Sequence, residues 1–357
     1  MRILLAWTDE TSPNLGVRAL GRGSKDLLRR IWPQAEFVYM NYGSKPEAVT
    51  WSPRGLVREW VTGRRGMRDW LDGFDLYWDT RSGDSFSDIY GLPRHTTMSM
   101  IHEFAARRHV PTVLAPQTIG PFGSRRSRLL ARRDVHRSRL VLARDPLSAA
   151  ASATLGRPVD LTTTDLVFGI DQPVAERGHD VLLNVSGLLW RSTRHGDPEA
   201  YRRQIRAVID GLLVRGRSVT LFPHVLDSAD PDNDVPVATE LHAEYEGRLG
   251  LVVPRDLEHA RAVIAGASLV IGARMHACLN ALSTGTPAIA MAYSRKFAPL
   301  MGELGWPHVV DASGSEEVAD RILAAVDDPS LADQARQAQQ RGQRLLADVQ
   351  HLVEATR

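Results

Sequence analysis

The 357-residue sequence contains a single cysteine and no long hydrophobic run. Because Cys278 has no second cysteine to pair with in the chain, a reducing compartment is favoured. No apolar stretch approaches the length that spans a bilayer, and the apolar run at residues 3–7 is too short for the core of a signal peptide. These absences predict a cytoplasmic protein.

Lysine is also scarce, since only Lys25, Lys45 and Lys296 stand against 41 arginines. Genomic base composition explains this bias, but it makes the isolated Lys296 a mild pointer to a specific role. The net charge of +2 excludes a polycation and gives no indication of nucleic-acid binding.

The length of the chain and its 43% hydrophobic composition favour two globular domains. Short apolar runs alternate with helix-like stretches, which is typical of parallel sheets covered on both faces. We expect strands at residues 3–7, 37–40, 76–78, 112–115 and 140–143, and then at 181–185, 219–222, 251–253, 269–271 and 288–292. This pattern predicts an α/β fold with two doubly wound, Rossmann-like domains that face each other across a cleft.

The domain boundary is expected in the polar segment 171–178, which contains proline and glycine and has no periodicity. We therefore predict an N-terminal domain at residues 1–172, a C-terminal domain at 179–312, and a helical tail at 313–357. Ligands of doubly wound sheets bind beyond the carboxyl ends of the strands, so the segments that follow the strands are the candidate site.

Two turns in the first half are candidates for ligand contact. Asn14 and Gly16 open a helix after the first strand, where a glycine lets backbone N–H groups approach an anion. A purely structural tight turn explains these two residues equally well. After the third strand come Gly83, Asp84 and Ser85, and then Asp88, which would share a helical face with Asp84 if a helix begins here. This second turn could recognise hydroxyls or phosphate, or simply cap a helix.

Two further polar residues of the first half also follow strands. Gln117 begins a stiff turn that reads Gln-Thr-Ile-Gly-Pro, and it could donate to a substrate carbonyl or hydroxyl or be purely structural. Arg144 follows the fifth strand beside Asp145, which suggests an oriented guanidinium that suits phosphate or carboxylate. The alternative for Arg144 is a salt bridge between domains.

No aspartate or glutamate occurs between Glu258 and Glu303, although this span carries six basic or titratable side chains: His259, Arg261, Arg274, His276, Arg295 and Lys296. Arg274, Met275 and His276 lie between a strand and a helix, where free N–H groups and the helix dipole favour anions. The single sign of charge predicts a site for a doubly charged substrate, and because Arg274 lies two residues before His276, we favour a functional role for His276.

His224 also follows a strand and precedes an acidic stretch with Asp230, Asp232 and Asp234. These carboxylates could bind a metal or sugar hydroxyls, but the loop lacks the glycine and glutamate of a calcium loop. A solvated acidic loop is the commonest structure for such a run, and no metal site is predicted.

Taken in chain order, these segments resemble the polysaccharide pyruvyl transferase family. The resemblance rests on Asn14-x-Gly16, Gly83-Asp84-Ser85-Phe86-Ser87-Asp88, Gln117-Thr118-Ile119-Gly120-Pro121-Phe122, Ala143-Arg144-Asp145, Pro223-His224, Gly272-Ala273-Arg274-Met275-His276-Ala277, Gly285-x-Pro287 and Tyr293-x-x-Lys296. The sequence departs from the family pattern in three places: Val17 replaces an aspartate after the first glycine, Arg81-Ser82 replaces the first two glycines of a triplet, and the tail beyond Asp311 carries no recognisable motif.

The resemblance implies a glycosyltransferase-B-like fold and transfer of pyruvate from phosphoenolpyruvate to a sugar diol as a ketal, with no cofactor beyond this co-substrate. Arg144, Arg274, Met275, Lys296 and Gln117 would bind the donor, with the two arginines in opposite domains. His276 is our first choice for proton transfer and His224 our second, because histidine exchanges protons near neutral pH. The acceptor-side residues would be Asn14, Gly16, Gly83, Asp84, Ser85 and Asp88.

Two other functions share this fold. Many retaining nucleotide-sugar glycosyltransferases hold the donor ribose with a carboxylate pair in the second domain, and the acid-free span argues against that arrangement here. A non-catalytic glycan- or anion-binding protein would not need Arg144, Arg274, His276 and Lys296 together. The acceptor could be lipid-linked in cell-envelope synthesis, and the basic stretch 125–133 could then hold the enzyme at the inner face of the membrane, although an ordinary arginine-rich helix is favoured.

Overall fold

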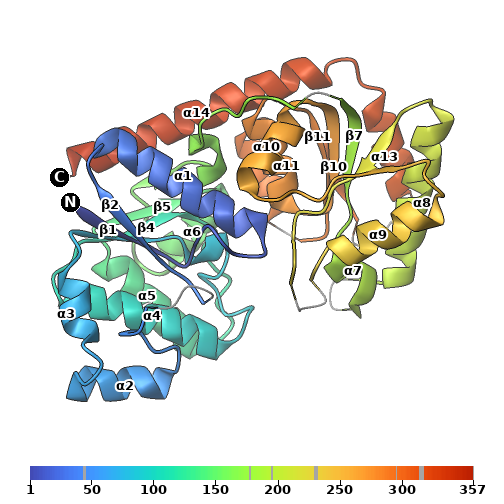
Figure 1. Ribbon diagram of the computed structural model, residues 1–357. Helices are drawn as coiled ribbons and strands as arrows, with labels where there is room; N and C mark the ends of the chain where they lie inside the picture. The colour runs from blue at the N-terminus through green and yellow to red at the C-terminus, as the bar shows by residue number, and fades with distance from the viewer. Residues whose placement is uncertain are drawn as a thin grey trace. The chain divides into compact units, whose positions relative to one another are not determined.

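The computed structural model describes residues 1–42, 46–176, 178–193, 196–228, 232–294, 296–312 and 317–356, and it contains two six-stranded parallel sheets (Figure 1). The chain divides into two compact units. The first unit comprises Met1–Ser12, Leu20–Ile170 and Arg344–Arg357, and the second comprises Pro13–Ala19 and Asp171–Gln343. Lys45, Asp230, Arg295 and residues 313–316 lie outside the described residues.

The sheet of the first unit has the strand order β2-β1-β3-β4-β5-β6. Its strands are β1 (Arg2–Ala6), β2 (Glu36–Met40), β3 (Leu76–Asp79), β4 (Thr112–Gln117), β5 (Leu140–Ala143) and β6 (Leu161–Thr162). The helices are α1 (Leu15–Ile31), α2 (Pro53–Thr62), α3 (Met67–Asp72), η1 (Arg81–Gly83), α4 (Leu92–Arg107), α5 (Arg125–Arg137), α6 (Pro146–Thr154) and η2 (Leu166–Gly169). Leu4, Trp7, Tyr77, Met98 and Phe104 belong to its buried core.

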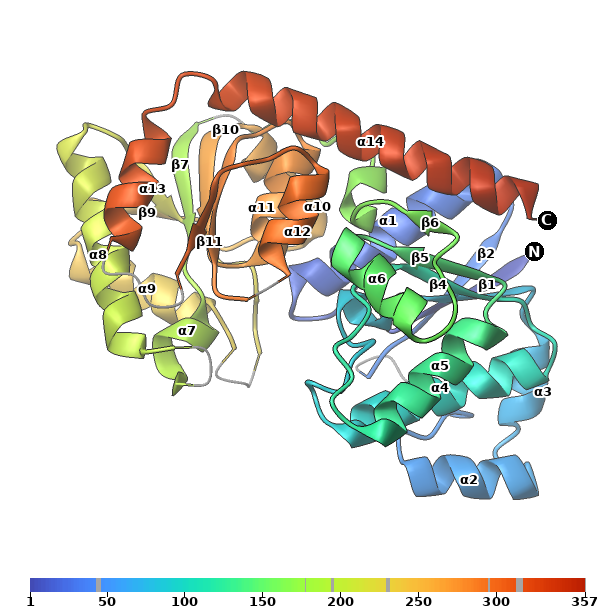
Figure 2. The same cartoon turned by 180° about the vertical axis from the view of Figure 1, so that it is seen from behind.

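The sheet of the second unit has the order β12-β11-β10-β7-β8-β9, seen from the opposite side in Figure 2. Its strands are β7 (His179–Asn184), β8 (Val219–Leu221), β9 (Gly250–Leu251), β10 (Ala267–Gly272), β11 (Ala288–Ala292) and β12 (Val309–Asp311). The helices are α7 (Gly187–Arg191), α8 (Pro198–Val214), α9 (Val235–Glu244), α10 (Leu257–Ala265), α11 (Met275–Ser283), α12 (Phe297–Glu303), α13 (Val318–Val326) and α14 (Leu331–Ala355). None of the described helices is both long and apolar enough to cross a membrane.

Several helices begin where a side chain satisfies the free N–H groups of the first turn. Ser124 forms a capping box with Ser127 at the start of α5, and Asp145 accepts from the backbone of Ser148 at the start of α6. In the second unit, Asp256 accepts from the backbone of His259 at the start of α10. These caps fix where each strand-to-helix loop ends.

All ten expected strands are present, and the predicted α/β class is confirmed. Two edge strands of 2 and 3 residues, β6 and β12, were not predicted from the sequence. The break between the units falls at Ile170 and Asp171. Two further divisions were not expected from the sequence: residues 13–19 cluster with the second unit, and the helical tail is divided at Arg344.

Candidate active site

The loops that follow β7, β8 and β10 of the second unit meet at the buried carboxylate of Asp234. This carboxylate accepts from the backbone N–H groups of Gly187 (2.9 Å), His224 (3.1 Å) and Val225 (3.0 Å). The side-chain amide of Asn184 donates to it as well, at 3.2 Å. Because a buried carboxylate is stable only when its oxygens are satisfied, Asp234 fixes these loops together.

Arg274 is the N-cap of α11, and its guanidinium is held by two aspartates. Its Nη2 donates to Asp234 Oδ1 at 2.7 Å, and its Nη1 donates to Asp232 Oδ1 at 2.8 Å. Burial opposes the charge, but the two carboxylates outweigh it and raise the pKa of Arg274.

These contacts correct two expectations about charge. The span from residue 259 to 302 has no acid of its own, but Asp232 and Asp234 reach it from a loop forty residues earlier in the chain. The expectation of a single sign of charge is therefore wrong for the surroundings of Arg274. The expectation of a solvated acidic loop is also wrong for Asp234, which is fully buried.

The buried imidazole of His224 is held in one protonation state by Asn280. The Asn280 side-chain oxygen accepts from Arg261 Nη1 at 3.0 Å, so its Nδ2 is the donor that faces His224 Nε2 at 3.2 Å. The same Nδ2 donates to the backbone oxygen of His276 at 2.8 Å. His224 Nε2 is therefore an acceptor. Burial, with smaller effects from His276 and Arg274, lowers the pKa of His224 well below its ordinary value.

His276 lies in the first turn of α11, where it packs against the backbone of Gly16. A Cβ atom at residue 16 would lie 2.6 Å from His276 Nδ1, so only glycine permits this contact. Asn14 accepts from Gly16 N at 2.8 Å, and Leu15 N donates to the backbone oxygen of His224 at 3.1 Å. The structure thus places Asn14 and Gly16 beside His224 and His276 of the second unit.

Two further predicted donor residues, Met275 and Lys296, also belong to the second unit. Met275 is buried as the first residue of α11, and Lys296 is the half-buried N-cap of α12. A hollow of about 600 Å³ lies at the carboxyl ends of β11 and β12, and its lining includes Tyr293, Ser294 and Asp311. Lys296 is not among the residues that line it.

In the first unit, Arg144 is buried in an ion pair with Asp165, which is 2.6 Å from its Nη1. Its Nε also donates to Thr118 Oγ1 at 3.0 Å. The neighbouring carboxylate, Asp145, instead caps α6, so the expected orienting partner of this guanidinium was wrong. Arg144 is held in place by groups of its own unit.

Gln117 is fully buried, and its Nε2 donates to the backbone oxygen of Asp79 at 2.9 Å. In the structure it therefore joins the ends of β3 and β4.

The turn after β3 has a left-handed backbone at three successive residues, with φ of 46° at Arg81, 51° at Ser82 and 83° at Gly83. A Cβ atom on Gly83 would lie 3.2 Å from Arg144 Nη1, so this turn lies directly against the Arg144 side chain. The backbone of Thr118 donates to Gly83 O at 2.8 Å. Gly83, Arg144 and Thr118 are thus brought together.

The helix that would align Asp84 with Asp88 does not form, because η1 ends at Gly83 and α4 begins only at Leu92. Asp84 accepts from Tyr90 OH at 2.8 Å, and Ser85 Oγ accepts from Arg94 at 3.2 Å.

Asp88 joins its loop to the start of α5. Its carboxylate accepts from Gly123 N (2.9 Å), Ser124 N (3.0 Å) and Ser127 Oγ (2.7 Å). Burial alone would raise the pKa of Asp88, but these hydrogen bonds lower it. Asp88 therefore orders the turn that ends the Gln117 segment.

Comparison with known protein families identifies the family to which the chain belongs. A model of the polysaccharide pyruvyl transferase family matches residues 14–295. The chain belongs to this family. The matched region includes every predicted site residue except Lys296, and it confirms the resemblance seen in the sequence.

A curated relative of this polysaccharide pyruvyl transferase family member is the amylovoran biosynthesis protein AmsJ of Erwinia amylovora. The two are 25% identical over 270 residues, which cover 68% of this chain and 62% of AmsJ. The chain thus spans less than two thirds of the length of that relative.

Two solved structures show the same fold at low sequence identity. A UDP-GlcNAc 2-epimerase from Neisseria meningitidis, bound to UDP-GlcNAc, has a TM-score of 0.59 and 11% identity, covering 100% of this chain and 99% of its own. HepE from Anabaena, in complex with UDP and glucose, has a TM-score of 0.57 and 13% identity, with the same coverage. These matches confirm the glycosyltransferase-B-like architecture and say nothing of the ligand.

A buried charge network behind the Arg81 turn was not found by sequence reasoning. Arg81 is fully buried and pairs with Asp79 and Asp134, each at 2.9 Å. His102 Nδ1 lies 3.1 Å from Asp79 Oδ2, and Ser99 Oγ donates to Asp134 at 2.6 Å. The signal was available, because Arg81 stands where the family usually has glycine.

Proposed function

We propose that this protein transfers pyruvate from phosphoenolpyruvate to two hydroxyls of a carbohydrate, forming a ketal and releasing phosphate. Membership of the polysaccharide pyruvyl transferase family supports a transferase that acts in polysaccharide synthesis. The similarity to AmsJ supports the same process at lower identity. The reaction needs proton transfer and anion binding, and it needs no cofactor beyond its phosphoenolpyruvate co-substrate.

The observation that supports this proposal is that Asn280 links the backbone of His276 to a buried, neutral His224. Asn280 donates to His224 Nε2, and burial lowers the pKa of His224 well below its ordinary value. A second positive charge on this pair is therefore disfavoured. If the pair supplies a proton to the substrate, His276 supplies it, and His224 and Asn280 position the helix turn that carries it.

The chemistry balances with one general acid. Protonation of the enol methylene converts it to a methyl group and leaves an oxocarbenium-like centre at C2. One sugar hydroxyl then adds to C2, phosphate leaves, and the second hydroxyl closes the ring. Of the two hydroxyl protons, one replaces the proton given to the methylene and the other departs with phosphate. A histidine that exchanges protons near neutral pH suits the first step.

The donor carboxylate and phosphate require cationic surroundings. We propose that Arg274, Met275 and Lys296 supply these from the second unit and that Arg144 and Gln117 act from the first. Since both arginines are already ion-paired, we expect them to orient strand-end loops and to offer the donor only their remaining N–H groups. The positive end of the α11 dipole adds to this field.

The acceptor is proposed to be a glycan or glycoconjugate of the cell envelope, handled in the cytoplasm at the inner face of the membrane when it is lipid-linked. Gly83, Asp84, Ser85 and Asp88 would shape the acceptor side of the first unit. Asn14 and Gly16 lie against the histidines, so they would affect proton transfer more than acceptor choice.

The test is incubation of the purified protein with phosphoenolpyruvate and a panel of nucleotide-linked and lipid-linked sugars. Phosphate release that depends on an acceptor, with a pyruvate ketal found on that sugar by NMR, is the expected result. Thermal stabilisation by phosphoenolpyruvate but not by UDP-sugars should accompany it. Protection by a UDP-sugar with no effect of phosphoenolpyruvate would favour a glycosyltransferase and overturn the proposal.

A further inference from the structure

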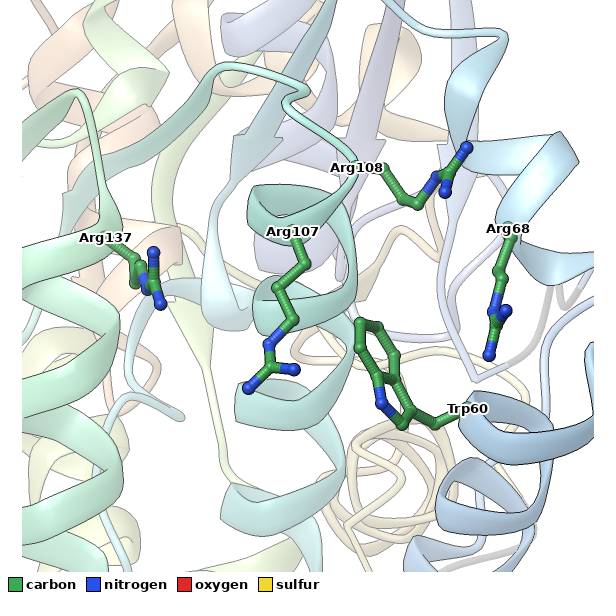
Figure 3. A pocket seen from close by; sticks show the side chains of 5 residues that line it. All are labelled: Trp60, Arg68, Arg107, Arg108 and Arg137. Carbon is green, nitrogen blue, oxygen red and sulfur yellow. The ribbon is translucent and has the colours of Figure 1, made fainter.

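A hollow rich in arginine lies among the helices of the first unit, away from the candidate site. Its volume is about 510 Å³, and it is lined by Trp60 of α2, Arg68 of α3, Arg107 and Arg108 at the end of α4, and Arg137 at the end of α5 (Figure 3). Because α4 and α5 end just before the amino ends of β4 and β5, this hollow and the loops of the candidate site belong to opposite edges of the sheet.

The hollow has more positive than negative charge. Arg108 pairs with Asp72, while Arg107 and Arg137 share the single carboxylate of Glu103 with Arg133. Among the described residues, no carboxylate lies within 4.0 Å of the Arg68 guanidinium. Four arginines therefore face two carboxylates, and an anion in the hollow would restore the balance.

Trp60 organises the guanidiniums on one side of the hollow. Arg107 lies over its ring at 4.7 Å and Arg68 at 5.4 Å, while Phe104 packs edge-on at 4.6 Å. Cation–π contacts hold arginines in place without neutralising them. The hollow thus presents pre-positioned N–H donors, as phosphate recognition requires.

The outer face of α2 next to the hollow is both apolar and basic. Val57 and Val61, one turn apart, are 55% and 74% exposed, and Arg54 and Arg58 are exposed beside them. The helix has one acid, Glu59, which is buried and accepts from the backbone N–H groups of Arg65 in the following loop and of Met67 at the start of α3. Figures 1 and 2 show α2 as the outermost helix on this side of the unit.

We propose that the α2 face and the arginine hollow form a docking surface for a membrane of anionic phospholipids. The phosphodiester of a lipid headgroup occupies the hollow, and Val57 and Val61 enter the boundary between headgroups and acyl chains. A free anion would explain the arginines but not the exposed valines, whereas an amphipathic basic helix binds the interface through both. This proposal concerns binding alone and does not depend on the proposed reaction.

The surface differs from the basic stretch 125–133 that the sequence first suggests. In α5, Arg133 forms an ion pair with Glu103, and Asp134 faces inward to Arg81. Only Arg137, beyond that stretch, reaches the hollow.

The experiment is co-sedimentation of the full chain with phosphatidylcholine vesicles, with or without phosphatidylglycerol, at low and high salt. The wild type should bind only the anionic vesicles, and salt should weaken this binding. Arg68→Gln combined with Arg137→Gln removes the arginine that has no carboxylate within 4.0 Å among the described residues and the arginine whose ion pair, 3.7 Å to Glu103, is the longest in the hollow. This variant should bind roughly 25-fold more weakly, at about fivefold per arginine near an anionic surface. Val57→Ser combined with Val61→Ser should also weaken binding, by several-fold.

Matched controls separate this surface from general charge and hydrophobicity. Arg341→Gln with Arg344→Gln removes two exposed arginines of α14, and Val174→Ser with Val214→Ser removes two exposed valines elsewhere. Both control variants should bind as the wild type does, and all variants should keep its melting temperature.

Three outcomes would overturn the proposal. The first is an absence of binding to anionic vesicles, and the second is an equal loss of binding in the controls. In the third, inorganic phosphate stabilises the wild type thermally but not Arg68→Gln, and neither protein binds vesicles. This result would assign the hollow to a soluble anion.

Discussion

Replacing Gly16 by alanine tests the position of His276 without touching the imidazole itself. Gly16 lies in the first turn of α1 and has no left-handed backbone, so alanine fits the conformation and should be favoured in the helix by up to about 1 kcal/mol. The added Cβ, however, would lie 2.6 Å from His276 Nδ1 and 2.8 Å from its Cγ. Ordinary contacts begin near 3.4 Å, so the ring must move by about 0.8 Å.

A displacement of this size should act on turnover and spare the fold. Misplacing a catalytic group by about 1 Å can lower a rate by roughly 10²-fold. We therefore expect kcat for phosphoenolpyruvate-dependent phosphate release to fall by about 10- to 100-fold, with a nearly unchanged melting temperature and KM for phosphoenolpyruvate. Gly302→Ala is the matched control, because Gly302 also lies in a helix, α12, and a Cβ atom there would have no neighbour within 4 Å. A Gly16→Ala enzyme with wild-type kcat would remove His276 as the proton donor.

Three further predictions concern the same residues. His276→Gln should fold normally and bind the donor but lose about 10²–10⁴-fold in turnover, and His224→Gln should lose less. Arg144→Ala and Arg274→Ala should each weaken donor binding by roughly 1.5–3 kcal/mol in calorimetry, with partial recovery in Arg274→Lys. Unchanged donor affinity in both alanine variants would exclude these arginines from donor binding. Arg274→Ala should also lower the stability of the fold in urea, because it leaves the buried Asp234 carboxylate uncompensated. Because the folded protein lowers the pKa of His224 below its usual 6.5, the unfolded chain binds more protons, and stability should decline as the pH falls below about 6.5. In His224→Gln, the urea unfolding midpoint should fall less steeply as the pH decreases. If the midpoint depends on pH as steeply as in the wild type, the prediction is contradicted.

Structural features that depend only on the local sequence pattern could be predicted from the sequence. The buried strands are visible in the sequence as short apolar runs. Arg274 was correctly predicted at the start of a helix, because the apolar pattern changes there from strand to helix periodicity. Edge strands β6 and β12 have too few residues for any such pattern. The functional roles of the site residues stay predictions, since family membership does not assign them.

Contacts between distant segments could not be predicted in this way. Nothing in the local pattern at Asp234 shows that it will be buried against Arg274, forty residues later. Similarly, Asn14 and Gly16 follow the first strand of the first unit, yet they pack with His224 and His276 of the second. One clue was present: Asn280 is a polar residue one turn after His276 on an otherwise apolar helix, and such a residue usually has a buried partner.

Contacts between distant segments also explain how Arg81 and Ser82 can replace the glycines that are usual in the family. A left-handed backbone costs a non-glycine residue of the order of 1–2 kcal/mol, which is why a glycine triplet suits this turn. Here the turn keeps that backbone, with compensation from the side chains: Arg81 pairs with Asp79 and Asp134, and Ser82 Oγ donates to Trp7 O at 2.9 Å. Since the Arg81 guanidinium is fully buried, it faces the interior and not a ligand. The substitution therefore changes what stabilises the turn, while the glycine that contacts Arg144 is retained.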